Sequence, residues 1–300
     1  MSALLDSLST AFHGNAEQRR VLESVLRDGL PGARNEAWKY TSLRALERRT
    51  FAPASPDVST AEVPALTHVP APRLVFVNGR FDARQSDCSG LPEGVTLHAL
   101  SQDSPSHQVP TDETLAIHAS IFSRLAVVLA DEGVVLQVDD GIQVEAPIHL
   151  VHIGAASEDD IAWHTRHRIA LGARASLAIV EQHLHADEHA NLGNMLTEVS
   201  LGVGASLLYA HVQDESPRAT LFVRTQATLA ADAHYQRVDL ELGAALSRHE
   251  LNVRLEGDGA RVSANGVLLA TGRRHIDTRL GIEHAARDTT CDLVLSLIHI

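Results

Sequence analysis

One pattern of fifteen residues occurs four times in the second half of this chain, and it restricts the fold more than any other feature. The copies read HRIALGARASLAIVE from His167, TEVSLGVGASLLYAH from Thr197, TQATLAADAHYQRVD from Thr225 and LNVRLEGDGARVSAN from Leu251. Their first residues are 30, 28 and 26 positions apart. Each copy has two alternating apolar stretches joined by a short corner. Because such a strand pair cannot bury its apolar face alone, the copies must stack, and the period predicts a β-solenoid.

The corner of the repeat suggests how the strands turn. We expect Gly172, Gly202 and Gly257 to adopt φ values that a Cβ atom forbids, and alanines such as Ala175 to lie where neighbouring coils crowd. An antiparallel β-sandwich whose turns happen to recur is the alternative. Alternate residues on both sides of the corner are expected to point inward: Ile169, Leu171, Leu177, Ile179, Val199, Leu201, Leu207 and Tyr209.

The first part of the chain has a different texture. Helical periodicity covers residues 3–30 and 112–130, the second helix with Thr111 as its N-cap, and an Asn78-Gly79 turn predicts a hairpin. The predicted fold is mainly β: a small α-rich N-terminal domain over residues 1–131, then a right-handed parallel β-helix over 132–294. We expect the helix at 112–130 to cap the open end of this solenoid.

The chain ends on LSLIHI, in the middle of a strand pattern and without a closing coil. Since a solenoid needs an end cap, we expect the C-terminal part of the protein to be missing. A transposon adapter read in frame would encode the same six residues. Residues 295–300 are therefore expected to be a non-native, adapter-derived tail, and an ordinary apolar C-terminal strand is the alternative.

Charge and cysteine content exclude several classes of function. The chain has 25 basic and 38 acidic residues, a net charge of −13, so nucleic acid and anionic membranes would repel it. It has no apolar run long enough to span a bilayer, and its start lacks the features of a secretory signal. Two distant cysteines fit a reduced, cytoplasmic protein.

The densest group of possible metal ligands is the segment Glu181–His189, which contains His183, His185 and His189. On a strand, His183 and His185 would share one face and could share a metal ion. The segment lies between two repeats, however, and a polar loop explains it without a ligand. The sequence therefore predicts no metal site and leaves open whether these three histidines bind one.

No pattern of a catalytic nucleophile or phosphate-binding loop occurs in the chain. We therefore predict no catalytic residue. The remaining candidates are expected to be structural. They are acidic turns at Asp139, Asp140, Glu158, Asp159 and Asp160, partly solvated histidines at His164, His167, His275 and His284, an exposed thiol at Cys88 and a buried one at Cys291.

Four segments together resemble the SufB/SufD family of iron–sulfur cluster assembly proteins. They are Asn35-Glu-Ala-Trp-Lys-Tyr-Thr, Phe76-Val-Asn-Gly-Arg-Phe, Gly141-Ile-Gln-Val-Glu-Ala-Pro-Ile, and the corner from His167. The resemblance covers residues 1–294, and its N-terminal segment favours the SufD branch. It implies a scaffold without enzymatic activity that pairs with a SufB-like paralogue and a SufC-like ATPase.

The resemblance also implies what the chain carries. An Fe–S cluster would be held transiently at an interface with SufB in the full-length protein, and no cofactor would be bound by this chain alone. The family's late Cys-x-His-Gly segment and the SufC-binding helices after it are absent, which fits a truncated fragment. A carbohydrate-active β-helix enzyme, a lyase or hydrolase, is the alternative, and a purely structural β-helix is a third.

Overall fold

The tight corners of the repeat join strands that belong to two different sheets. The computed structural model describes residues 2–55, 64–102 and 120–300, and in its solenoid each coil gives one strand to each sheet. The strands of successive coils are parallel and in register: Leu177 pairs with Leu207, and Leu207 pairs with Tyr235. This arrangement confirms the parallel β-solenoid and excludes the antiparallel sandwich.

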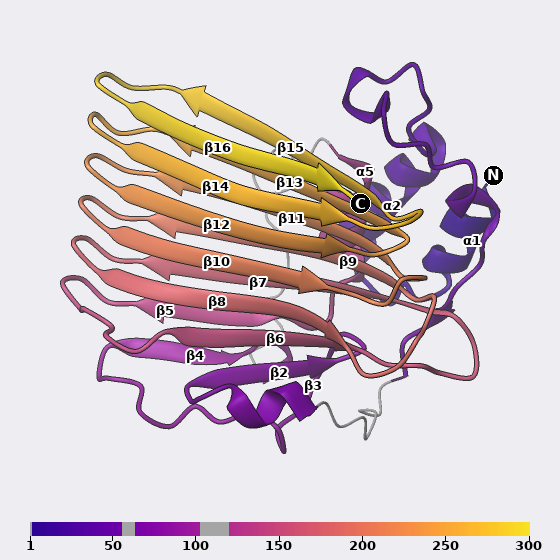
Figure 1. The fold of residues 1–300 in the computed structure, drawn as a ribbon, viewed down its shortest axis with the longest axis horizontal. Helices are drawn as coiled ribbons and strands as arrows, with labels where there is room; N and C mark the ends of the chain where they lie inside the picture. The colour runs from indigo at the N-terminus through magenta and orange to yellow at the C-terminus, as the bar shows by residue number, and fades with distance from the viewer. Residues whose placement is uncertain (1, 56–63, 103–119) are drawn as a thin grey trace.

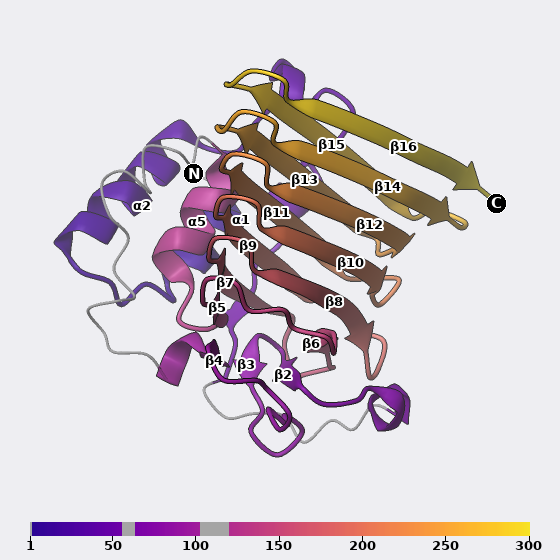
Figure 2. The same cartoon turned by 90° about the vertical axis from the view of Figure 1, so that its left-hand side faces the viewer.

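The two stacks of strands lie face to face (Figures 1 and 2). The first sheet has the order β15–β13–β11–β9–β7–β5–β4, with β1 paired to β7. Its strands are β1 (Ala52–Pro53), β4 (Val95–Ala99), β5 (Val134–Val138), β7 (Ile161–Leu171), β9 (Leu192–Leu201), β11 (Thr220–Leu229), β13 (Leu246–Leu255) and β15 (His275–His284). The second sheet has the order β16–β14–β12–β10–β8–β6–β2–β3. Its strands are β2 (Arg73–Val77), β3 (Arg80–Phe81), β6 (Ile148–Gly154), β8 (Ser176–His185), β10 (Ser206–Asp214), β12 (His234–Gly243), β14 (Arg261–Ala270) and β16 (Thr290–His299).

Residues before 131 close one end of the stack. The predicted hairpin around Asn78 and Gly79 forms from β2 and β3, and β2 continues the second sheet by pairing in parallel with β6. On the first sheet, β4 pairs antiparallel with β5. At the other end, β16 includes most of the suspected tail, and Leu295 pairs with Gly266 of β14.

The helices form a layer outside the first sheet (Figure 2). They are α1 (Ala3–Ser9), α2 (Ala16–Asp28) and α5 (Ile121–Leu129). The chain also has short 3-10 helices η1 (Glu36–Trp38), η2 (Leu46–Arg48), η3 (Pro64–His68) and η4 (Leu100–Gln102). Of these, η3 packs through Leu66 against β2 and β6 of the second sheet. The predicted helix at 3–30 is thus two helices. Within the predicted helix at 112–130, Thr111 and residues 112–119 lie outside the described residues. No helix in the described ranges is long and apolar enough to cross a membrane.

The expectation that the helix ending near residue 130 caps the open end of the solenoid is wrong. Helix α5 lies against the outer face of the first sheet, over β7 and β9. Outward residues Ala162, Leu192 and Leu196 make this face apolar, and they pack with α5 side chains such as Leu125 in one core cluster. Covering this face removes its apolar side chains from water, which favours this position of the helix.

The Trp-Lys-Tyr-Thr segment fastens the N-terminal helices to the solenoid. The ring centroid of Trp38 lies 5.5 Å from that of Phe122 in α5, and the guanidinium of Arg248 in β13 lies 4.0 Å above the indole. The hydroxyl of Thr41 donates a hydrogen bond to Asp277 of β15. Between them, Tyr40 is 79% exposed. Trp38 and Thr41 therefore contact the solenoid, whereas Lys39 and Tyr40 between them face solvent.

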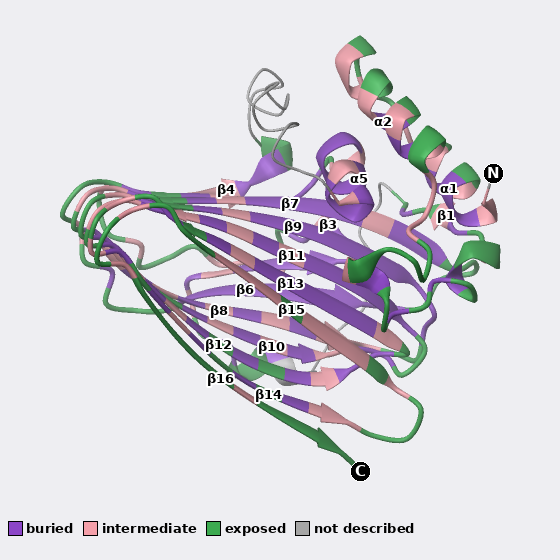
Figure 3. Ribbon diagram, turned by 90° about the horizontal axis from the view of Figure 1, so that it is seen from above, coloured by how far each residue is buried: buried purple, intermediate pink, exposed green. Residues whose placement is uncertain are grey.

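The two sheets meet at the tight corners and diverge away from them (Figure 3). The narrow side is filled by alanines and aliphatic residues, and the eight residues predicted to point inward around the corners are all buried in one core cluster. Ala175, Ala205 and Ala233 are at most 1% exposed, as expected for positions where coils crowd. The wide side must be filled by larger side chains.

The explanation offered for the corner glycines needs correction. The positive φ angles occur two residues later, at Arg174, Gly204, Asp232 and Gly259. What Gly257 needs is space: a Cβ there would lie 1.9 Å from the backbone nitrogen of Ala231 on the adjacent coil. At Gly257, glycine is therefore required because two backbones come into contact. The left-handed turn position, by contrast, is occupied by Arg and Asp as well as by Gly.

We expect Gly257→Ala to lower the free energy of unfolding by about 1–3 kcal/mol, because neighbouring backbone must move to admit the methyl group. Gly32→Ala is the matched control, since a Cβ there has nothing within 4 Å. It should change stability by less than about 0.5 kcal/mol. Urea unfolding followed by circular dichroism measures both, and equal effects would contradict the close-approach argument.

Candidate functional site

The wide side of the solenoid interior contains large polar side chains instead of aliphatic ones. We call them the interior polar network. All are at most 5% exposed. In β8, the inward sequence away from the corner is Leu177, Ile179, Glu181 and His183, so the change from apolar to polar occurs along one strand face. The network consists of His152, His167, Glu181, His183, Tyr209, His211, Gln213, Tyr235, Arg237, Asp239, Glu241 and His249.

The register of the second sheet arranges these residues in columns across the coils. Position by position, His152 of β6 pairs with His183 of β8, and His183 pairs with Gln213 of β10. In the neighbouring column, Glu181 pairs with His211. Because parallel coils repeat in register, polar residues of successive coils come into direct contact.

Four imidazole rings form a continuous row through the interior. The centroid distances are 4.9 Å from His152 to His183, 5.0 Å from His183 to His211, and 5.1 Å from His211 to His249. Phe76 stacks on His152 at 5.2 Å and ends the row. The row thus connects three coils of the second sheet with β13 of the first.

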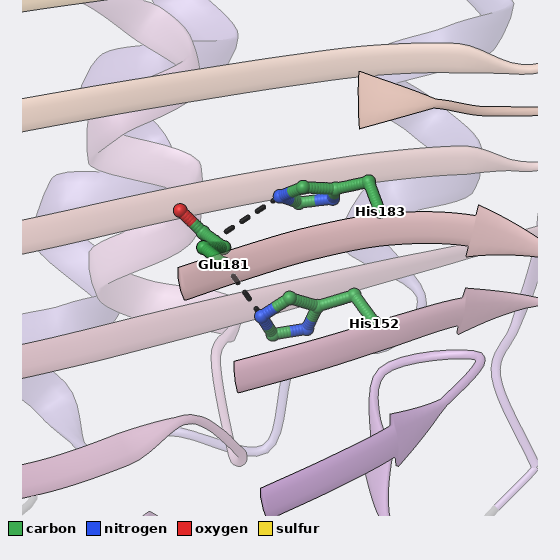
Figure 4. A group of neighbouring side chains, drawn as sticks. All are labelled: His152, Glu181 and His183. Atoms are coloured by element: carbon green, nitrogen blue, oxygen red, sulfur yellow. Dashed lines mark ion pairs between the residues drawn. The ribbon is translucent and has the colours of Figure 1, made fainter. Parts of the chain in front are cut away.

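At one end of this row, two histidines face one carboxylate (Figure 4). Glu181 Oε1 lies 3.5 Å from His152 Nε2 and 3.3 Å from His183 Nε2. The other oxygen of Glu181 accepts a hydrogen bond of 2.9 Å from the hydroxyl of Tyr209. We call His152, Glu181 and His183 the His–Glu–His group.

The environment sets the protonation of this group. Burial by itself raises the pKa of Glu181, but the facing imidazole of His183, together with His211 and His152, holds that pKa well below its usual value. Burial, with the neighbouring His183 and His167, holds the pKa of His152 well below its usual value. The group therefore combines an ionised carboxylate with a neutral imidazole.

Further along the row, His211 and His249 flank Asp239, but the positively charged side chain of Arg237 already lies against this carboxylate. Arg237, a fully buried residue, donates a 2.7 Å hydrogen bond from Nε to Asp239 Oδ1. Its Nη2 lies 3.2 Å from His249 Nε2. Although burial alone lowers the pKa of Arg237, Asp239 and the two tyrosines raise it well above its usual value. This part of the network is an internally compensated ion pair.

The histidines considered for a metal site do not converge. His183 belongs to the His–Glu–His group, whereas His185 Nδ1 lies 3.0 Å from the carbonyl oxygen of Asp214. His189 Nε2 lies 3.2 Å from Glu215 Oε2. The predicted loop begins only after His185, since β8 includes both of the first two histidines.

Several other expectations meet mixed outcomes. His275 and His284 are exposed, as are the acidic turns and Cys88. His164 and His167 were expected at the surface, which is wrong, because both are buried in β7. Cys291 was expected to be buried, which is also wrong. It pairs with the inward residue Val262, but β16 is the outermost described strand of its sheet, so no coil covers it.

Sequence reasoning missed His152 and His249, which come from single positions on strands that otherwise looked apolar or ordinary. Alternation provided a usable signal. His152 has the same parity as Ile148 and Leu150, both of which are core residues. A polar residue continuing an inward-facing series is a candidate for the interior polar network.

Comparisons with known protein families decide the assignment. The N-terminal region of SufBD proteins matches residues 3–150, and the SufBD core domain of the SUF system for FeS cluster assembly matches residues 152–299. The chain belongs to the SufBD family. The core match spans the stacked strands from β6 to β16, and the resemblance read from the sequence is confirmed.

Curated relatives give the same family. The chain is 28% identical over 285 residues to the iron–sulfur cluster assembly protein SufD of Escherichia coli K12, covering 94% of this chain and 65% of that protein. It is 25% identical over 267 residues to an iron–sulfur cluster assembly SufBD family protein of Synechocystis, covering 83% of this chain and 58% of that protein. The chain thus spans less than two thirds of the length of these relatives.

We expect Arg237→Met to lower the free energy of unfolding by about 3–5 kcal/mol, because it leaves Asp239 charged and buried without its partner. The matched control is Arg254→Met, which removes two exposed ion pairs, to Glu256 and Glu283, whose side chains are 49% and 61% exposed. That change should cost less than about 1 kcal/mol. Replacing both residues in Arg237→Met/Asp239→Leu should recover part of the loss, and urea unfolding of all three variants checks the order.

A pH dependence is expected from His164, which lies outside the network and whose Nδ1 is 2.9 Å from Asn194 Nδ2. Burial lowers the pKa of His164 from 6.5 to about 3. Between these values the unfolded chain binds a proton that the folded chain does not. Stability is therefore lost as pH falls below 6.5, by about 1.4 kcal/mol per pH unit from this residue.

The measurement is the free energy of urea unfolding at pH 7.5, 6.0 and 5.0 for the parent chain and His164→Gln. The variant should show the shallower pH dependence, whatever its stability at pH 7.5. Parallel pH profiles would contradict the expectation.

Proposed function

We propose that this chain is a SufD-type scaffold subunit for iron–sulfur cluster assembly, which acts in the cytoplasm with a SufB-like paralogue and a SufC-like ATPase. The observation that carries the proposal is the match of the SufBD core domain to residues 152–299. The same residues form the stacked coils, so the family match and the solenoid are one unit. Stacked coils offer long, regular surfaces suited to docking another protein.

The proposed role is assembly without catalytic turnover by this chain, with the cluster as cargo held at a partner interface. Clusters are ligated mainly by cysteine thiolates, usually four of them. Cys88 lies at one end of the second sheet, because its neighbour Asp87 forms an isolated β-bridge with Arg73 of β2. Cys291 lies in β16, at the other end of this sheet. The two thiols cannot ligate one cluster together, so further ligands have to come from a partner or from segments of the full-length protein outside this chain.

The alternative, a carbohydrate-active β-helix enzyme, is disfavoured by the placement of the aromatic side chains. Sugar-binding grooves use exposed aromatic faces. Among the three tyrosines and two tryptophans, Tyr40 alone is exposed, and Tyr209 and Tyr235 are fully buried in the interior polar network. The exposed strand faces therefore lack a sugar platform.

Co-purification tests the proposal. When the complete gene product is co-expressed with the SufB-like and SufC-like proteins of the same cell, affinity purification of a tagged SufB-like protein should retain it in constant proportion. An unrelated β-solenoid of similar size and charge serves as the control and should not be retained. Failure to bind either partner would overturn the proposal, and cleavage of a polysaccharide would support the alternative.

A further inference from the structure

We propose that the His–Glu–His group binds one divalent first-row transition-metal ion, of the Zn²⁺ or Fe²⁺ type, inside the solenoid. The ligands would be His152 Nε2, Glu181 Oε1 and His183 Nε2. The inference goes beyond the scaffold role, which requires no metal ion resident in this chain.

The spacing of the three donor atoms fits such an ion. Metal–ligand bonds of about 2.1 Å at tetrahedral angles separate neighbouring donors by about 3.4 Å. The two distances from Glu181 Oε1 to the imidazole nitrogens are 3.3 and 3.5 Å. One donor atom from each of the three residues lies within 4.8 Å of the other two, and the side chains converge on the same region (Figure 4).

The same three atoms have no hydrogen-bond partner among the described residues. Their side chains are 7%, 1% and 1% exposed for His152, Glu181 and His183, so bulk water does not satisfy them. The two nitrogen–oxygen distances also exceed the usual range of N–H···O hydrogen bonds. Buried polar atoms without partners are costly and rare, and one cation would satisfy all three together.

The surroundings hold the donors in place. His152 and His183 occupy paired positions on adjacent coils, and Glu181 lies two residues before His183 on the same face. Tyr209 orients the carboxylate through its hydrogen bond to Glu181 Oε2, as outer residues commonly do at metal sites. Nε2 of His167 is also buried and unpartnered, and its ring lies 5.1 Å from that of His152. Because His167 Nδ1 accepts a hydrogen bond from the backbone nitrogen of Val134, Nε2 carries the proton and can donate to a water molecule in the fourth position.

The donor set selects the kind of ion. Two imidazoles and one carboxylate suit Zn²⁺ and Fe²⁺, whereas Mg²⁺ and Ca²⁺ prefer oxygen ligands throughout. The neighbouring group of His211, Asp239 and His249 is not proposed as a site. There, the Arg237 guanidinium already lies against Asp239 and His249, and a second cation would be repelled.

Cobalt binding provides the test, because Co²⁺ substitutes for both ions and absorbs visible light when coordinated by nitrogen and oxygen. The purified 300-residue chain, stripped with a chelator, is titrated with Co²⁺, and a second sample is produced in Co²⁺-supplemented medium because the site is enclosed. We expect one equivalent per chain by metal analysis. Zn²⁺ should displace it, Fe²⁺ without oxygen should displace it only in excess because it binds such sites more weakly than Co²⁺, and a large excess of Mg²⁺ should not.

Variants locate the site. His183→Gln and Glu181→Gln should each weaken Co²⁺ binding at least about 100-fold, and Tyr209→Phe, which keeps every ligand, about 10- to 100-fold. His164→Gln, another buried histidine, is the matched control, and His249→Gln tests the neighbouring group. Both should bind as the parent does. Circular dichroism verifies folding, and Tyr209→Phe supplies the decisive comparison if a ligand variant does not fold.

Absence of stoichiometric Co²⁺ in both samples would overturn the proposal and leave the group as a buried set of contacts without metal. Binding that survives His183→Gln and Glu181→Gln, or that is lost in His249→Gln alone, would overturn it as well. The partner experiment reads co-purification and not metal content, so either proposal can fail without the other.

Discussion

The fold depends on how closely successive coils approach one another at the tight corners. A Cβ on Gly172 would lie 2.6 Å from the backbone nitrogen of Asp140, and one on Gly257 would lie 1.9 Å from that of Ala231. Backbone contact at this side leaves room between the sheets only for small residues such as Ala205. Because the two strands of a coil diverge from this point, the interior widens along every strand (Figure 3).

This widening explains why the interior changes from apolar to polar. In β12, the inward series after Ala233 runs Tyr235, Arg237, Asp239 and Glu241, so larger and then charged side chains replace alanine beyond the corner. A chain with 4% aromatic residues fills this width with His, Tyr, Arg and carboxylates. Such groups are tolerated inside only when they satisfy one another, as Arg237 and Asp239 do. The interior volume and the need for polar partners together restrict which side chains can occupy each inward position along a strand.

Much of the solenoid could be predicted from the sequence, because both the repeat and the alternation are local patterns. The inward residues from Ile169 to Tyr209 were found in this way and are buried. Burial of His164 could not be read locally, since it depends on α5, whereas His167 continues the inward series of Ile169 and Leu171 and alternation could have identified it. Exposure of Cys291 depends on whether a further coil covers its strand, and alternation alone does not encode this. At the corners, the sequence identifies glycine as the important residue. It does not tell whether glycine is needed for a positive φ angle or for its lack of a Cβ atom.

The His–Glu–His group could not be found by short-range motif spacing because a solenoid distributes a site over its coils. Two ligands on one strand face are two residues apart, and a ligand on the adjacent coil is one coil period away. His152 and His183 are 31 positions apart, and they contact because β6 and β8 pair in parallel and in register. In a parallel stack, the informative spacing is therefore the coil period plus or minus two, and a search at that spacing would have placed His152 beside Glu181 and His183.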